Sequence, residues 1–117
     1  MSGRKSYYSG LSAEDQVAQL YDRSGWPVIA RRWRGPGGEI DLIARNGAEV
    51  IFIEVKHARS HAIAAARVTA RQMERIYASA ACFLGGEPEG QHTQVRFDVA
   101  LVDGVGRIEV LENAFAV

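Results

Sequence analysis

The stretch EIDLIARNGAEVIFIEVKHAR, residues 39–59, decides the fold of this 117-residue chain. Asn46-Gly47 near its centre is among the strongest short signals for a β-hairpin. The flanking residues are rich in Ile, Val, Leu and Phe, which is typical of strands in a buried sheet. Residues 39–45 and 48–56 are therefore predicted to be two antiparallel strands. They also carry three acids and a lysine, and charged residues are rarely buried without a partner.

The charged residues are predicted to share one face of this hairpin. With a two-residue turn at its centre, Asp41 lies opposite Phe52 and Glu39 lies opposite Glu54. Directly paired residues of an antiparallel ladder point to the same side, so Glu39, Asp41, Glu54 and Lys56 face one way. Asp41 and Glu54 are then diagonal neighbours, with Cβ atoms roughly 7 Å apart. The other face is expected to form the core, with Ile40, Leu42, Ala44, Ile51, Ile53 and Val55.

Two carboxylates at that separation can coordinate one cation, and Lys56 reaches the same space. Mg2+ prefers oxygen ligands and keeps several waters, and a nearby lysine can orient a water or neutralise a phosphate. These parts suit metal-assisted hydrolysis of a phosphodiester. The alternative is a solvent-facing hairpin whose charges form cross-strand ion pairs. Glu14, on the apolar stripe of the first predicted helix, fits either a site role or the positive end of that helix.

The rest of the chain predicts one α/β domain with the element order α-β-β-β-α-β-β. Ser12 is expected to cap a helix that ends at Gly25. A second helix is expected to run to Leu84 from a capping box at Thr69-Ala70-Arg71-Gln72. Strands are predicted at 27–34, 93–102 and 107–111, and the Ala-rich residues 57–68 fit a loop or a helix equally. Residues 1–10 read as a flexible arm and 11–117 as one mixed sheet flanked by helices.

Composition narrows the function classes. The net charge is zero, which is unusual for a protein that only coats nucleic acid. Residues 1–75 hold 12 Lys and Arg against 8 acids, and the remainder hold 2 against 6, so basic charge collects around the hairpin. The single Cys82 excludes an internal disulfide and a cysteine-based zinc site, and it is expected in the core. No apolar run approaches the ~20 residues of a membrane span, and no signal peptide is evident. A cytoplasmic protein is expected.

The motifs GEIDLIAR, VIFIEVKHAR and VRFDVALV closely resemble the YraN family of small bacterial proteins. The similarity runs from about Gly10 to the C-terminus and includes Glu14, ARRWR at 30–34 and the terminal AFAV. The resemblance implies a restriction-endonuclease-like fold, related to archaeal Holliday-junction resolvases. In that superfamily an Asp, a Glu-x-Lys on the next strand and an acid from the first helix build a magnesium-dependent nuclease site.

Carried over by position, the resemblance makes Asp41, Glu54, Lys56 and Glu14 the expected catalytic residues. Asp41, Glu54 and Glu14 would bind Mg2+, or Mn2+ in its place. Many members are expected to have a lysine near the start of the second helix, where this chain has Arg71 or Gln72, and Gln72 is the expected auxiliary group. The arginines expected to hold the DNA backbone are Arg31, Arg32, Arg34, Arg59 and Arg71.

The first hypothesis is therefore a magnesium-dependent endonuclease that acts on DNA, including branched or structured DNA. The second is a non-catalytic nucleic-acid-binding or recombination and repair accessory module that keeps the fold. A third is an interaction subunit that needs a partner, and a self-pairing edge strand would make a homodimer. Trp33 fits base stacking or strand packing, whereas Arg96 and Asp98 are expected to form an internal ion pair that braces the sheet.

Overall fold

The computed structural model describes residues 12–114, so the predicted arm at residues 1–10 lies outside it. The helical elements are α2 (Ala13–Arg23), α3 (His61–Ala66), α4 (Ala70–Leu84) and the 3-10 turn η1 (Gly90–His92). The strands are β1 (Val28–Gly35), β2 (Gly38–Asn46), β3 (Glu49–His57), β4 (Val95–Val102) and β5 (Ile108–Leu111).

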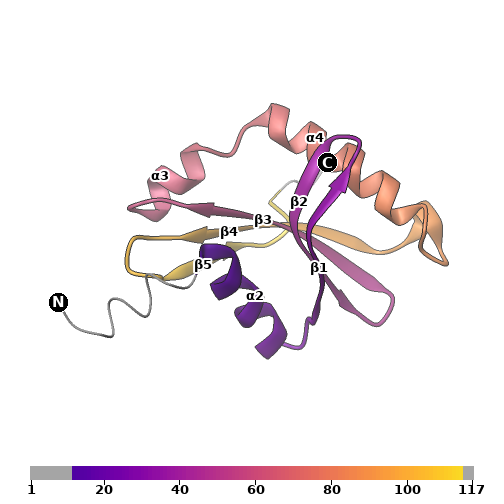
Figure 1. The fold of residues 1–117 in the computed structure, drawn as a ribbon, viewed down its shortest axis with the longest axis horizontal. Helices are drawn as coiled ribbons and strands as arrows, with labels where there is room; N and C mark the ends of the chain where they lie inside the picture. The colour runs from indigo at the N-terminus through magenta and orange to yellow at the C-terminus, as the bar shows by residue number, and fades with distance from the viewer. Residues whose placement is uncertain (1–11, 115–117) are drawn as a thin grey trace.

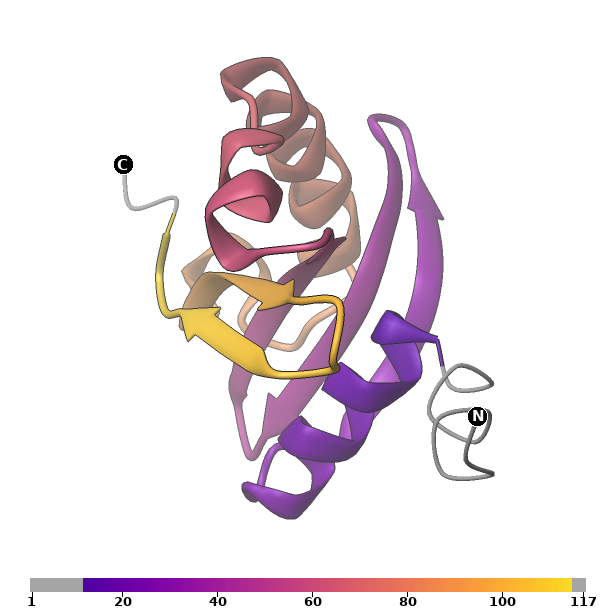
Figure 2. The same cartoon turned by 90° about the vertical axis from the view of Figure 1, so that its left-hand side faces the viewer.

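The five strands form one mixed sheet in the order β1-β2-β3-β4-β5. Only β3 and β4 run parallel, and α3 and α4 lie in the connection between them because parallel neighbours need a crossover. Helix α2 covers one face of the sheet, while α3 and α4 cover the other (Figures 1 and 2). The α/β class and the mixed, helix-flanked sheet are confirmed, with α3 added to the predicted order, and the arrangement is consistent with a nuclease-like fold.

The helix starts follow from capping side chains. Ser12 Oγ accepts a hydrogen bond from the Asp15 N–H at 3.0 Å, and Thr69 Oγ1 accepts one from the Gln72 N–H at 3.2 Å. Both predicted N-caps are confirmed. The ambiguous segment 57–68 contains the helix α3, which Ser60 caps through the N–H of Ile63.

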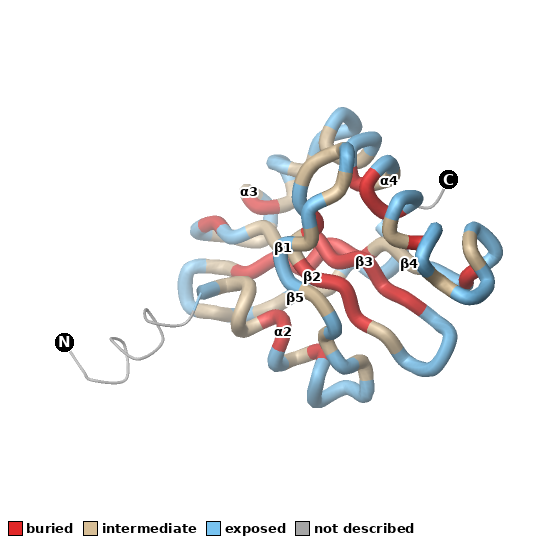
Figure 3. Tube along the Cα trace, turned by 45° about the vertical axis from the view of Figure 1, so that its right-hand side comes forward, coloured by how far each residue is buried: buried red, intermediate tan, exposed pale blue. Residues whose placement is uncertain are grey.

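Both faces of the predicted hairpin are buried (Figure 3). Leu42, Ala44, Ile51 and Ile53 pack under α2, as predicted for the apolar face. The opposite face also carries a core, formed beneath α3 and α4 by residues that include Ile43, Val50, Phe52, Val99 and Leu101. The prediction that this second face simply gathers the charge is therefore wrong, because helices cover both sides of the sheet, and Asp41, Glu54 and Lys56 lie beyond the last β2–β3 pair.

The hairpin turn lies one residue further along the chain than predicted. Asn46 pairs with Glu49, and the two-residue loop is Gly47-Ala48. Gly47 has a φ of 62°, which suits the first position of a type II′ turn, where glycine is preferred. The register moves by two residues, so the same-face relations predicted for the paired segments 42–46 and 49–53 survive. Continued one step past its last pair, Leu42 with Ile53, the register sets Asp41 directly opposite Glu54 rather than diagonal to it.

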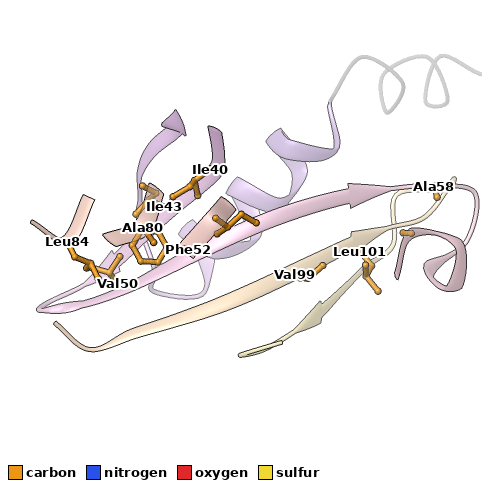
Figure 4. Packing of buried hydrophobic residues seen from close by; sticks show 11 residues of the cluster. Ile40, Ile43, Val50, Phe52, Ala58, Ala80, Leu84, Val99 and Leu101 are labelled. Carbon is orange, nitrogen blue, oxygen red and sulfur yellow. The ribbon is translucent and has the colours of Figure 1, made fainter. Parts of the chain in front are cut away.

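Ile40 departs from the predicted face. It packs with Ile43 beneath α4 (Figure 4) rather than with Leu42 beneath α2. Arg32 on the neighbouring strand has a φ of 50°, a left-handed conformation that is uncommon outside glycine. The regular pairs Arg31–Leu42 and Trp33–Ile40 lie on either side of it. Leu42, on one side of Arg32, packs beneath α2, whereas Trp33 and Ile40, on the other side, pack beneath α4.

Two further expectations concern single side chains. Trp33 packs edge-on against Phe83, with ring centroids 5.4 Å apart, so its role is strand packing. Cys82 is exposed, and its predicted place in the core is wrong, because α4 turns Ile76, Ala80 and Leu84 toward the sheet instead. No helix within residues 12–114 is long and apolar enough to cross a membrane.

Candidate active site

The site forms where the sheet splits. The pairing of β2 with β3 ends at Leu42 and Ile53, while β2 continues beside β1 to Gly38 and β3 continues beside β4 to His57. Asp41 and Glu54 are the first residues beyond the last β2–β3 pair. A backbone N–H that loses its ladder partner needs another acceptor, and the N–H of Val55 donates to Asp41 Oδ2 at 2.8 Å. The aspartate therefore stands at the point where the strands part.

Glu54 is the central side chain of the site, with only 7% of its surface exposed. Its Oε2 accepts a hydrogen bond from Gln72 Nε2 at 2.6 Å. Its Oε1 is buried and has no hydrogen-bond partner among the described residues. A buried polar atom left without a partner costs roughly 1–3 kcal/mol, so it marks a place where another group is expected.

The electrostatics of Glu54 agree with that geometry. Burial, together with the neighbouring Asp41, raises the pKa of its carboxyl to about 8, while Lys56 acts in the opposite direction. Desolvation and a like charge both disfavour the ionised form. Without an added positive charge, Glu54 therefore holds a proton through neutral pH, and a cation placed between the two carboxylates would release it.

Lys56 lies two residues beyond Glu54 and is half-buried. Within residues 12–114 its ammonium group makes no hydrogen bond or ion pair to another side chain. The lysine thus keeps its donors free for a water or an anion.

Gln72 joins the site from the first turn of α4. The sequence predicted a reciprocal capping box with Thr69, and only half of it forms. The Gln72 backbone N–H donates to Thr69, but its side-chain amide donates to Glu54 instead. Gln72 therefore acts as a positioning residue, because it fixes the carboxylate of Glu54.

Glu14 is not brought into this group. Its Oε1 lies 3.2 Å from Arg32 Nε, in an ion pair at the start of α2. Over the described part of the chain, no three or more His, Cys, Asp or Glu side chains are arranged to hold a metal ion. Mg2+ is commonly held by only one or two carboxylates, with waters and substrate oxygens completing its shell. The pair Asp41 and Glu54, with its unpartnered oxygen, fits such a cation.

The arginines predicted to hold nucleic acid fall into two groups. Those on β1 are each paired with an acid: Arg31 with Asp15, Arg32 with Glu14 and Arg34 with Glu39. Arg59 and Arg71 are exposed, and neither is ion-paired within residues 12–114. The irregularity and charges of β1 also discourage pairing with a second sheet edge, so the homodimer stays a prediction without support from this strand.

A pocket of about 230 Å³ adjoins Glu54. Its walls are the β1–β2 turn and the first two turns of α4, and its lining includes Arg34, Gly38, Glu39, Gln72 and Arg75. Arg75 was not among the arginines named individually for the DNA backbone. It follows Gln72 by three residues, so the helical period that places Gln72 toward the sheet also brings Arg75 to the pocket rim.

Fold and site together define an α/β protein whose mixed sheet splits around a pair of carboxylates, the buried Glu54 and the half-buried Asp41, with a lysine and a glutamine beside them. The chain belongs to the family UPF0102, described as an uncharacterised protein family and also called the YraN family, whose model matches residues 13–102. The predicted family is thus confirmed.

Relatives match nearly the whole chain. A UPF0102 protein of Cereibacter sphaeroides is 69% identical over 99% of each chain. One from Ruegeria pomeroyi is 56% identical over 97% of this chain and 92% of its own. One from Dinoroseobacter shibae is 41% identical over 95% of this chain and 83% of its own.

Proposed function

We propose that the protein is a Mg2+-dependent endonuclease that hydrolyses phosphodiester bonds of DNA. The observation that carries the proposal is the buried Glu54 beside Asp41, with one carboxylate oxygen that no described residue satisfies. A purely structural hairpin gains nothing from such an oxygen, because burial without a partner is costly. Strongly perturbed carboxylates beside a pocket are instead typical of catalytic sites. The resemblance to junction resolvases makes branched DNA the first substrate to test.

Each residue has a role that its contacts support. Asp41, held by the Val55 N–H, and Glu54, held by Gln72, are the carboxylates that would bind the ion. When bound, Mg2+ would activate a water and neutralise charge on the phosphate. The free ammonium group of Lys56 would orient that water and stabilise the negative charge that develops on the phosphate oxygens. Gln72 keeps the Glu54 carboxylate turned toward the site.

The test is a nuclease assay with Mg2+ or Mn2+ on linear, flapped and four-way DNA. Glu54→Gln and Lys56→Ala are expected to lower cleavage roughly 100-fold or more, the loss seen when a charge-stabilising group is removed. Glu49→Gln, which changes an exposed glutamate at the start of the same strand, is the matched control and should cleave like the wild type. Failure of the folded wild type to cleave every substrate would overturn the proposal. Equal cleavage by all variants would identify a contaminant.

One observation favours the alternative of a non-catalytic nucleic-acid-binding module. Glu14, expected as a third ligand, is engaged with Arg32 instead of with the other carboxylates. A module of that kind would bind four-way DNA in the same experiment and leave it uncut.

A further inference from the structure

The cations nearest to the proposed site differ in how they are engaged. Arg34 on β1 forms an ion pair with Glu39, with Nη2 and Oε2 3.0 Å apart. Arg75 on α4 is exposed, and in the described part of the chain it has no ion pair or side-chain hydrogen bond. Arg71 stands one turn before Arg75 and is equally unpaired within residues 12–114. Unpaired positive charge is therefore found on α4 rather than on β1.

Arg75 and Arg34 line the pocket that adjoins Glu54, from opposite walls. Arg34 and Glu39 offset each other's charge in their ion pair. Arg75 instead presents an unpaired guanidinium group to the pocket, and the Gln72 amide adds a neutral donor. Such a pocket suits an anion, and the planar guanidinium group of arginine matches the oxygens of a phosphate.

The pocket is held in shape before any ligand arrives. Ser79, which is buried on α4, accepts a hydrogen bond from the Gly37 N–H at 3.0 Å and donates one to the Gly38 carbonyl at 2.8 Å. The turn lies directly against α4, since a Cβ on Gly37 would come within 2.0 Å of the Arg75 carbonyl oxygen. The wall that carries Arg34 is thus fixed relative to the helix that carries Arg75, and a preformed site loses less entropy on binding.

We propose that this pocket is a phosphate subsite, in which Arg75 binds the backbone phosphate next to the bond that the proposed nuclease cleaves. This inference rests on the proposed function for the identity of the neighbouring bond. Arg75 is the anchor, and Arg34, shared with Glu39, contributes from the opposite wall. The contact is to the phosphate and not to a base, so it acts on every DNA sequence alike.

The test measures DNA affinity in metal-free buffer, so it does not depend on cleavage. A fluorescently labelled four-way DNA is titrated with protein at several salt concentrations. Arg75→Ala is expected to weaken binding roughly tenfold, the loss of one charge-assisted contact. It should also lower the slope of log K against log salt by about 0.9, the value for one lost phosphate contact. Arg75→Lys keeps the charge and should restore the slope with only part of the affinity.

Arg23→Ala is the matched control, because Arg23 is an exposed arginine in the last turn of α2, on the other face of the sheet. It should leave both the affinity and the slope unchanged. An Arg75→Ala protein with the wild-type slope would overturn the subsite even if Glu54→Gln abolishes cleavage. A reduced slope in a protein that never cleaves DNA would support the subsite as a binding contact and overturn the nuclease. A wild type that does not bind DNA at all would overturn both.

Discussion

At the scale of single residues, Glu54 shows a conflict between stability and chemistry. The side chain is buried, yet only one of its two oxygens has a partner among residues 12–114. The two hydrophobic cores of the sheet offset this cost. A buried polar atom without a hydrogen-bond partner is an exception that is commonly found at functional sites. The cost to the fold depends on whether the carboxyl group is ionised, so it depends on pH.

The stability of the metal-free protein is expected to fall as the pH rises toward 8. Burial and Asp41 raise the pKa of Glu54 to about 8, so its contribution to stability is fully present below its unfolded pKa near 4.5 and is lost as pH rises through 8. At 1.36 kcal/mol per pH unit, the loss is at most roughly 5 kcal/mol. Glu54→Gln removes the titration, so its stability relative to the wild type should grow across this range. Urea unfolding at several pH values with a chelator present measures the difference.

Glu49→Gln provides the comparison for that experiment, because it removes an exposed glutamate from the same strand. Its unfolding free energy should follow the wild type at every pH. If the unfolding free energies of Glu54→Gln and the wild type change in parallel with pH, the raised pKa of Glu54 would be contradicted.

Addition of Mg2+ or Mn2+ is expected to raise the Tm of the wild type. A ligand that binds only the folded state stabilises it by about 2.7 kcal/mol at a concentration 100 times its Kd. Glu54→Gln and Asp41→Asn remove one carboxylate each and should show little shift. Thermal unfolding with the metal salt, against NaCl of the same ionic strength, measures this. An equal rise in wild type and both variants would assign the ion to another part of the chain.

At the scale of elements, the hairpin shows what could be predicted from the sequence. The alternation of charged and apolar residues fixed which side chains share a face, and this survived a two-residue error in register because strand periodicity is two. The reversal at Ile40 could not be predicted. It coincides with a left-handed Arg32 on the neighbouring strand, and an arginine gives no sequence signal for that conformation. The resemblance made Gln72 an expected auxiliary group, but its hydrogen bond to Glu54 was not predicted.

The contact between the β1–β2 turn and α4 gives a prediction at this scale. Gly37→Ala places a Cβ 2.0 Å from the Arg75 carbonyl oxygen, so the turn must move away from the helix. We expect a loss of about 3 kcal/mol, the upper end for overpacked sites, together with weaker DNA binding because the pocket wall shifts. Gly25→Ala is the control, since its Cβ would meet nothing within 4 Å and only its backbone conformation is strained. Equal destabilisation by the two variants in urea unfolding would show that the turn is not held against α4.

At the scale of the whole molecule, a buried polar network ties the α2 layer to the sheet. Asp98 on β4 is fully buried and accepts hydrogen bonds from Arg96, from the Tyr21 hydroxyl at 2.6 Å and from the Asn113 N–H at 2.9 Å. The predicted Arg96–Asp98 pair is confirmed. Tyr21 and Asn113 could not be predicted as its partners, because they come from elements far away in the sequence.

This network yields a prediction about the stability of the whole domain. Asp98→Asn leaves Arg96 without its buried counter-charge and should cost about 3 kcal/mol, whereas Tyr21→Phe removes one hydrogen bond and should cost about 1 kcal/mol. Because Tyr21 and Asp98 share one network, the double variant should lose less than the sum of the two single losses. Glu112→Gln, which alters an exposed partner of Arg96, should change stability by less than about 0.5 kcal/mol.

Urea unfolding of the four variants measures these losses of stability. DNA binding by the same proteins shows whether the network affects stability alone or also the DNA-binding site. Neither Tyr21 nor Asp98 lines the pocket beside Glu54, so the folded fraction of each variant should bind DNA with the wild-type salt slope. Strict additivity of the two losses would mean that Asp98 and Tyr21 act independently. A changed salt slope in Asp98→Asn would mean that the face of the sheet covered by α2 takes part in DNA binding. The assignment of DNA binding to the α4 face alone would then be wrong.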